Sequence, residues 1–334
     1  MSIETRTGSG GSGLAALEMK SVGAALLSPE RVQSTAVWIG TVLLAIWASA
    51  AVPGFASSAN ISAIMYSTSA VGIAAVGMAF ITLSGNLFML SMGATAAVST
   101  IVFASCLHLG LLPGIIVVMA VGALFGLAQG VAVGVFKTNP IITTIAMASI
   151  ITGAGSFCSG GLTIVGQGDA SWLGIGRMAG IPNQIVLFLL AALVFSFIVE
   201  RTRFGRELRL IGLNPKAAHF TGLRVGRTLV IAYVLAAAAA AFAGALYGSQ
   251  AAQGNLKLGA GLDFDAIAAV LVGGVAIKGG QGRILDAAIG AVFLAIITNI
   301  LLLKGLSLEI QLIVKGLVVI ASVILGALAL GARK

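Results

Sequence analysis

The chain has 334 residues, of which 59% are hydrophobic and only 9% are charged, and its formal net charge is +9. No Asp, Glu, Lys or Arg occurs between Val32 and Phe136. A soluble domain needs a charged surface, whereas a charge at the centre of a bilayer costs roughly 2.5–3.5 kcal/mol, so this stretch excludes a soluble globular protein. The sequence therefore predicts a polytopic membrane protein.

Mostly apolar segments follow one another along the whole chain. A spanning helix needs about 20 such residues at a rise of about 1.5 Å each. The segments are continuous and lack the alternation of lipid-facing strands, which favours helices over a barrel. We predict an all-α polytopic membrane protein with about ten transmembrane helices, some of them broken. The expected spans are residues 35–53, 62–83, 89–107, 114–136, 140–160, 184–199, 228–249, 264–277, 285–303 and 310–330.

The segment before the first span differs in composition from the rest. It contains a Gly- and Ser-rich stretch at 8–13 and lacks the basic region and apolar core of a cleaved signal. Residues 1–34 are expected to be an uncleaved, flexible cytoplasmic tail, and residues 35–334 one transmembrane domain. Cys106 and Cys158 fall inside predicted spans, where the residue type predicts packing and no disulfide or metal site.

The distribution of basic residues predicts the orientation. The loop at 200–227 holds seven of the 19 Lys and Arg residues, so the positive-inside rule places it in the cytoplasm. Counting ten spans, the N-terminus lies on the same side. The basic residues are thus explained by their role in orienting the chain in the lipid bilayer, and we expect no nucleic acid as a partner. The seven residues are Arg201, Arg203, Arg206, Arg209, Lys216, Arg224 and Arg227.

Glycines recur at every fourth residue of the span at 114–136, at Gly122, Gly126, Gly130 and Gly134. This spacing places them on one helix face, where the missing side chains let another helix approach closely. The neighbour could be another span of this chain or a second subunit. We expect the contact to lie within the chain.

A weak internal repeat relates the two halves of the chain. Ile73–Val76 is identical in sequence to Ile267–Val270, and the same offset pairs Gly85 with Gly279. Each half then has an apolar segment interrupted by glycine and polar residues at a corresponding place. Paired broken helices are typical of the solute path of a transporter, although simple loop corners would give the same pattern.

Four polar residues are candidates for this path. Ser84, Asn86 and Gln281 lie at the two breaks, where they could hydrogen-bond hydroxyl groups of a passing solute. Asn299 lies inside a predicted span, and its amide is expected to bond a neighbouring helix more readily than to line the path.

Three charged residues lie near the outer ends of predicted spans. Asp263 and Asp265 come at the start of one span, where a helix N-terminus favours negative charge. Lys315 lies within the last span, and we expect its amine to extend toward the outer face, with a place in the path as the alternative.

The stretch from Asn214 to Gly222 in the basic loop predicts a short helix with both ends specified. Asn214 can cap the free N–H groups, Pro215 suits the first helical position, and Gly222 can adopt the left-handed conformation that ends a helix. The helix is expected either to tie two spans together or to dock a cytoplasmic partner.

Several stretches of the chain, covering about residues 35–330, resemble bacterial ATP-binding-cassette importer permeases of the ribose and simple-sugar type. They are Phe204–Leu223, Leu262–Val270 with the glycines at 273–274 and 279–282, Asn139–Thr144 and Ile313–Gly316. The resemblance implies a bacterial inner-membrane protein that pairs with a second permease subunit, identical or different. A cytoplasmic ATPase would grip the short helix, and a periplasmic binding protein would deliver the solute. The coupling residues that it implies are Arg206, Gly212, Asn214, Pro215, Ala217, Ala218 and Gly222.

Two features limit what the resemblance implies. The segment Ser84–Gly93 departs from the usual Gly-Gly-Ile-Asp-Leu-Ser-Val-Gly pattern and lacks its acidic residue, so no particular substrate is inherited. The chain also lacks the phosphate-binding motif G-x-x-x-x-G-K-[ST]. ATP and Mg are therefore expected on a separate ATPase, with no cofactor and no catalytic residue on this chain.

These features predict the transmembrane subunit of an ATP-driven importer for a small hydroxylated solute, such as a monosaccharide or a polyol. A secondary transporter or facilitator that works without ATP is the alternative from another class. An importer permease for branched-chain amino acids or nucleosides is the nearer alternative. A membrane enzyme is disfavoured, because the sequence contains no nucleophile–base pair and no cluster of metal ligands.

Overall fold

The computed structural model describes residues 29–331, with side chains described for residues 35–324. Residues 1–28 of the expected tail lie outside this range, and from Pro29 onward the backbone is helical. The long helices are α2 (Pro29–Ala51), α3 (Ser58–Leu83), α4 (Met92–Cys106), α5 (Leu111–Gly134), α6 (Pro140–Ser159), α8 (Asn183–Arg201), α9 (Arg203–Leu213), α11 (Val225–Ala251), α12 (Leu262–Gly273), α13 (Ile284–Leu303) and α14 (Leu308–Gly331). The short elements are η1 (Leu107–Leu109), α7 (Ser171–Gly174), α10 (Pro215–Phe220) and the strands β1 (Ile164–Val165), β2 (Arg177–Met178), β3 (Ile181–Pro182) and β4 (Gln253–Gly254).

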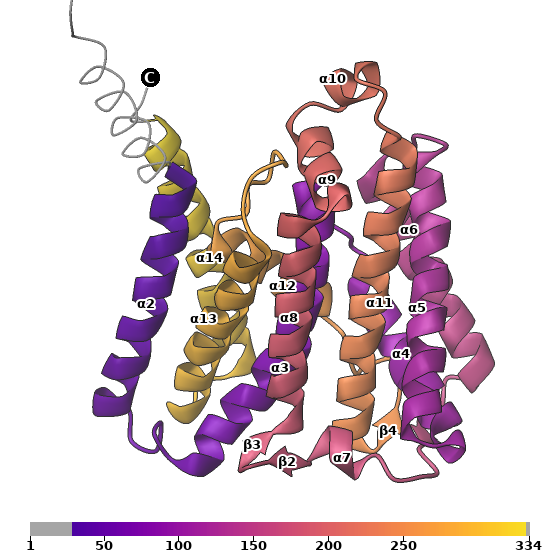
Figure 1. Cartoon of the computed structure of the whole chain (residues 1–334). Helices are drawn as coiled ribbons and strands as arrows, with labels where there is room; N and C mark the ends of the chain where they lie inside the picture. Colours follow the sequence, from indigo (N-terminus) through magenta and orange to yellow (C-terminus); the bar gives the residue numbers. More distant parts are fainter. Residues whose placement is uncertain (1–28, 332–334) are drawn as a thin grey trace, which may run out of the picture.

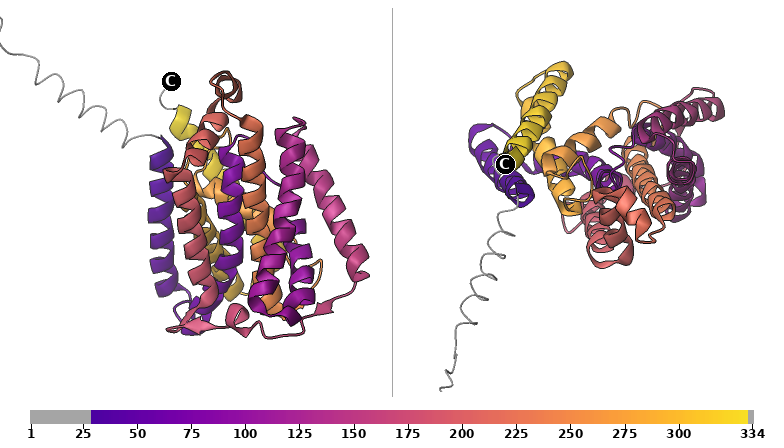
Figure 2. Two further views of the ribbon diagram at one scale, coloured as in Figure 1. Left: turned by 45° about the vertical axis from the view of Figure 1, so that its right-hand side comes forward. Right: turned by 90° about the horizontal axis from the view of Figure 1, so that it is seen from above.

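The long helices form one bundle with their axes roughly side by side (Figures 1 and 2). The helix α10 lies at one end of the bundle, together with α9 and the loop between α12 and α13. The first described residues of α2 and the last of α14 lie at this end too, which we call the α10 end. The elements α7, β2, β3 and β4 lie at the opposite end. The all-α architecture predicted from the sequence is confirmed.

Seven helical segments among the described residues are long and apolar enough to cross a membrane. They are Ser58–Leu83, Met92–Leu109, Leu111–Gly134, Pro140–Ser159, Asn183–Arg201, Val225–Ala251 and Ile284–Leu303. The finding supports a multi-pass membrane protein, as predicted, with fewer clear spans than the ten expected. Two of the three other expected spans, α2 and α14, extend beyond the part of the chain whose side chains are described, and the third is shorter than expected.

The predicted span at 264–277 is the shorter one. The helix α12 has 12 residues and ends at Gly273, because Gly274 adopts a left-handed conformation with φ of +89°. At about 1.5 Å per residue the helix is about 18 Å long, shorter than the hydrocarbon core of about 30 Å. The span predicted to begin at residue 89 likewise becomes helical only at Met92. In both places the helix covers only part of the predicted span, and we call these two segments the broken passes.

The centre of the bundle is formed by α3 and α11. Nearly every residue of α3 from Thr68 to Leu83 is buried, and the alanines of α11 from Ala236 to Ala245 are largely buried as well. Small side chains let the neighbouring helices approach closely, which replaces lipid contacts by dense packing.

The glycines of α5 lie directly against α11, as the sequence predicted for a contact within the chain. A Cβ atom on Gly126 would come 2.5 Å from the carbonyl oxygen of Tyr233, and one on Gly130 would come 2.8 Å from the Cα atom of Val230. Real Cβ atoms do not approach backbone this closely. The two helices therefore touch backbone to backbone along the glycine face.

Candidate functional site

The α10 end carries the short helix predicted from the basic loop. The helix α10 begins after Asn214, whose side-chain oxygen accepts a hydrogen bond from the N–H of Ala217 at 3.1 Å, and Pro215 occupies its first turn. Gly222 follows with φ of +82°. These local signals are the ones that predicted the helix, and both of its ends are specified by the residues expected.

One face of α10 is anchored and the rest is exposed. Ala218 is buried in a small apolar cluster with Ile211 and Leu229. On the exposed side lie Ala217 and Phe220, and Phe220 is 88% exposed. A short helix that is fixed on one side and exposes apolar surface on the other is suited to contact a partner.

The structure divides the predicted coupling residues into two groups. Gly212 and Ala218 are buried and face the bundle. The exposed members are Arg206, Asn214, Pro215, Ala217 and Gly222.

The four candidate path residues do not form one cluster. Ser84 is buried at the end of α3, and the amide of Asn86 donates to its hydroxyl at 2.9 Å. Gln281 is exposed in the loop between α12 and α13, which is bonded to the end of α3 near the α10 end. Asn299 lies near the end of α13 and is bonded to Asn60 near the start of α3, away from the other three.

Asn60 and Asn299 form a reciprocal amide pair between α3 and α13. Each amide nitrogen donates to the other side-chain oxygen, at 2.9 and 2.8 Å, which confirms the prediction that Asn299 bonds a neighbouring helix. We expect a double-mutant cycle of Asn60→Ala and Asn299→Ala to give a coupling energy of about 1 kcal/mol. The free energies of unfolding of the four proteins in detergent would measure it. Additive single effects would show that the pair contributes no stability.

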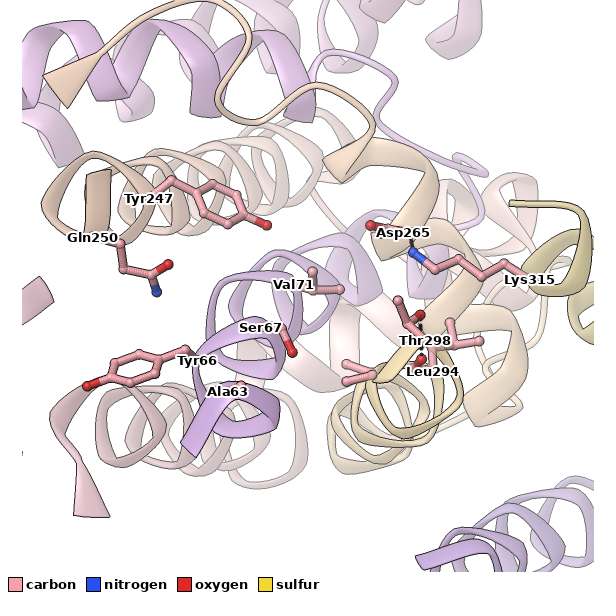
Figure 3. A pocket seen from close by; sticks show the side chains of 12 residues that line it. Ala63, Tyr66, Ser67, Val71, Tyr247, Gln250, Asp265, Leu294, Thr298 and Lys315 are labelled. Atoms are coloured by element: carbon pink, nitrogen blue, oxygen red, sulfur yellow. Dashed lines mark hydrogen bonds and ion pairs between the residues drawn. The ribbon is translucent and has the colours of Figure 1, made fainter. Parts of the chain in front are cut away.

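A cavity of about 480 Å³ lies between α3, α11, α12, α13 and α14 (Figure 3). Its polar lining consists of Tyr66, Ser67, Tyr247, Gln250, Asp265, Thr298 and Lys315, and its apolar lining of Ala63, Val71, Ala291, Leu294 and Ala295. Gln250 comes one residue before the end of α11, so the cavity lies toward the end of the bundle opposite α10. A pocket of this size, with apolar walls and several polar groups directed into it, is typical of a small-molecule site.

An ion pair between two helices lines one side of the cavity. Lys315 extends from α14, and its Nζ atom lies 2.9 Å from Oδ1 of Asp265 in the first turn of α12 (Figure 3). The two side chains are 19% and 33% exposed, so neither charge is fully hydrated. Pairing offsets part of the cost of removing both charges from water. We name this space the ion-pair cavity.

The ion pair was missed at the level of sequence, although both of its members were noted. Lys315 was expected to extend toward the outer face, whereas in the structure its amine bonds Asp265 and lines the cavity. Opposite charges inside two mostly apolar helices are the signal that could have paired them, since an isolated charge there is costly.

Comparison with known proteins identifies relatives over almost the whole chain. The family model described as branched-chain amino acid transport system / permease component matches residues 60–323. The chain is 32% identical over 298 residues to the ribose import permease protein RbsC of Bacillus subtilis, with 88% of this chain and 92% of the relative covered. It is 31% identical over 290 residues to RbsC of Escherichia coli K12, covering 85% and 90% of the two chains. It is 32% identical over 277 residues to the L-arabinose transport system permease protein AraH of the same strain, covering 82% and 84%. No solved structure matches the chain.

Proposed function

This chain belongs to the family described as the permease component of branched-chain amino acid transport systems, and we propose that it is the transmembrane subunit of an ATP-driven importer for a small hydroxylated solute, such as a monosaccharide or a polyol. The observation that carries the proposal is the similarity, along most of both chains, to import permeases whose names give ribose and L-arabinose as solutes. On this proposal the chain forms the translocation path and hydrolyses no ATP itself.

The lining of the ion-pair cavity supports a neutral solute over an amino acid. The hydroxyls of Ser67 and Thr298 and the amide of Gln250 can exchange hydrogen bonds with sugar hydroxyls. The two charges that line the cavity, Asp265 and Lys315, neutralise each other. A branched-chain amino acid carries an ammonium and a carboxylate group, and the cavity lining offers no second charge to bind either one.

The arrangement of the two ends supports import across the bacterial inner membrane. The basic loop that carries α10 is cytoplasmic by the positive-inside rule, so the ion-pair cavity lies toward the periplasmic side. A periplasmic binding protein would release solute on that side. On this topology α2, α12 and α14 complete ten passes, and the N-terminus is cytoplasmic.

The exposed face of α10 is the proposed docking point for a cytoplasmic ATPase, which would hold ATP and Mg. ATP binding would draw together the α10 helices of two permease subunits and rock the bundles between outward-open and inward-open states. Because the binding protein supplies selectivity, weak contacts in the path suffice for transport.

Two measurements test the proposal. The tagged chain would be extracted gently from its host, and the proteins that purify with it identified by mass spectrometry; we expect a stoichiometric ATPase with a phosphate-binding loop. Uptake of labelled ribose, arabinose, leucine and uridine would then be compared in cells with and without the chain, and we expect a loss for a sugar alone. A chain that purifies alone and moves solute into ATP-free vesicles would instead be a facilitator.

Substitutions in the ion pair test whether the cavity lies on the path. Lys315→Met leaves the carboxylate of Asp265 without its partner in a half-buried place, so we expect solute uptake to fall about tenfold, equivalent to about 1.4 kcal/mol. The double variant Asp265→Asn, Lys315→Met removes both charges and is expected to recover most of the uptake. Initial uptake rates at matched membrane levels would measure this. Equal rates for wild type and Lys315→Met would place the path elsewhere.

A further inference from the structure

Glycines from three separate segments meet at the α10 end. Gly85 follows α3, Gly212 lies in the last turn of α9, and Gly279 and Gly280 lie in the loop between α12 and α13. A Cβ atom on Gly212 would overlap the carbonyl oxygen of Leu83, and one on Gly279 would lie 2.6 Å from the Cα atom of Gly85. The three segments therefore touch backbone to backbone. We name Gly85, Gly212, Gly279 and Gly280 the glycine joint.

Hydrogen bonds and a side chain hold the joint closed. The N–H of Gly280 donates to the carbonyl oxygen of Leu83 at 2.8 Å, which ties the α12–α13 loop to the end of α3. The Arg209 guanidinium, on α9, donates to the carbonyl oxygen of Gly282 at 3.3 Å. The side chain of Leu213 lies against Gly280. Figure 1 shows this loop beside α9 at the α10 end.

The joint brings together two residues, Gly85 and Gly279, that occupy equivalent positions in the internal sequence repeat. Gly85 opens the non-helical segment before α4, and Gly279 lies between α12 and α13, so each marks a broken pass. The sequence offset that pairs these two residues is thus matched by a direct contact. Their φ values of +80° and +86° favour glycine, as does the +76° of Gly280.

We propose that the glycine joint carries the displacement of α9 and α10 into both broken passes at once, with Gly85, Gly212, Gly279 and Gly280 as positioning residues for import. This inference rests on the proposed function and identifies how docking at α10 reaches the path. The segments are packed so closely that no Cβ atom would fit between them, and the bonds from Gly280 to Leu83 and from Arg209 to Gly282 tie them together. The last turn of α9, the end of α3 and the α12–α13 loop therefore move as one body.

A reversible crosslink tests whether the joint moves as one body. A Cβ atom on Gly280 would lie 2.5 Å from Cγ of Leu213, so the Cβ atoms of Leu213→Cys and Gly280→Cys are at most about 4 Å apart, which suits a disulfide. Cys106 and Cys158 would first be replaced by alanine. We expect the oxidised and reduced forms, assembled with the ATPase and binding protein in sealed vesicles, to import solute at rates within about twofold. Import that stops on oxidation and returns on reduction would overturn the proposal.

Loosening the joint is the complementary test, and it remains decisive if the cysteine variant does not fold. Arg209→Ala removes the bond to Gly282 without placing bulk in the joint. We expect the ATP hydrolysed per solute imported to rise at least about fivefold, while ATPase activity stimulated by the binding protein stays within about twofold. Arg203→Ala, an exposed position on the same helix, is the matched control and should keep the wild-type ratio.

The outcomes separate the joint from the proposed function. If Arg209→Ala imported solute with the wild-type ratio of ATP hydrolysed per solute, the proposal for the joint would be wrong and the proposed importer function would be unaffected. A wild-type chain that neither binds nor stimulates an ATPase would overturn the importer itself, and the joint with it.

Discussion

Replacement of Ala217 by arginine is expected to abolish solute uptake while the protein remains folded in the membrane. Ala217 is exposed in the first turn of α10, and only its backbone is engaged: its N–H donates to the side chain of Asn214, and its carbonyl oxygen accepts from the N–H of Thr221. A long charged side chain there leaves the helix intact but occupies the surface that would contact the ATPase. We expect uptake to fall at least about 100-fold, equivalent to about 2.7 kcal/mol.

Uptake at matched membrane levels and co-purification of the ATPase would measure the effect of Ala217→Arg together. Ala217→Ser adds a single oxygen at the same place, so uptake and co-purification of the ATPase should both stay near wild type. Ala218→Arg, one residue further on, would put a charge into the buried cluster with Ile211 and Leu229 and should lower the level of folded protein instead. Undiminished uptake by Ala217→Arg would show that α10 does not dock the ATPase.

Replacement of Gly126 by leucine is expected to prevent the bundle from forming. A Cβ atom at this position would lie 2.5 Å from the carbonyl oxygen of Tyr233 and 2.7 Å from the Cα atom of Val234. The obstacle is backbone in the middle of α11, so α5 and α11 must separate along the whole glycine face. We expect a loss of more than about 4 kcal/mol, at the upper end of what single substitutions cost.

Gly153→Leu is the matched control for Gly126→Leu, because it makes the same change in the middle of α6. A Cβ atom on Gly153 would meet nothing within 4 Å. The yield of monodisperse protein in detergent and its thermal unfolding would compare the two variants. If both were folded equally well, the close contact of α5 with α11 would contribute no stability.

Features that depend on neighbouring residues could be predicted from the sequence. The glycine spacing predicted which face of α5 packs closely, because a period of four keeps residues near one side of a helix. Asn214 and Pro215 predicted the start of α10, since capping involves only the first turn. The hydropathy pattern predicted the order of the helices. It overestimated the length of α12, because hydropathy does not show that the helix ends at Gly273.

Features that depend on helix rotation and loop placement could not be predicted. The pairing of Asp265 with Lys315 requires that α12 and α14 turn the two side chains toward each other at one depth. The burial of Gly212 requires that two distant loops fold back onto the end of α9. Neither condition leaves a periodic signal in the chain. The docking role of α10 and the positions of the path residues remain predictions.

The burial of α3 has a consequence for how the protein is made. A large part of α3 is enclosed by α8, α11, α12 and α13, all of which are synthesised after it. During translation this helix is therefore surrounded by lipid until the helices that enclose it have been synthesised. Three of its hydroxyl groups already have a partner at that stage, because Ser62, Ser69 and Thr82 each donate a hydrogen bond to a carbonyl one turn earlier in the same helix. The helix α3, which occupies the centre of the folded bundle, thus enters the membrane with several of its side-chain hydroxyls already hydrogen-bonded within the helix.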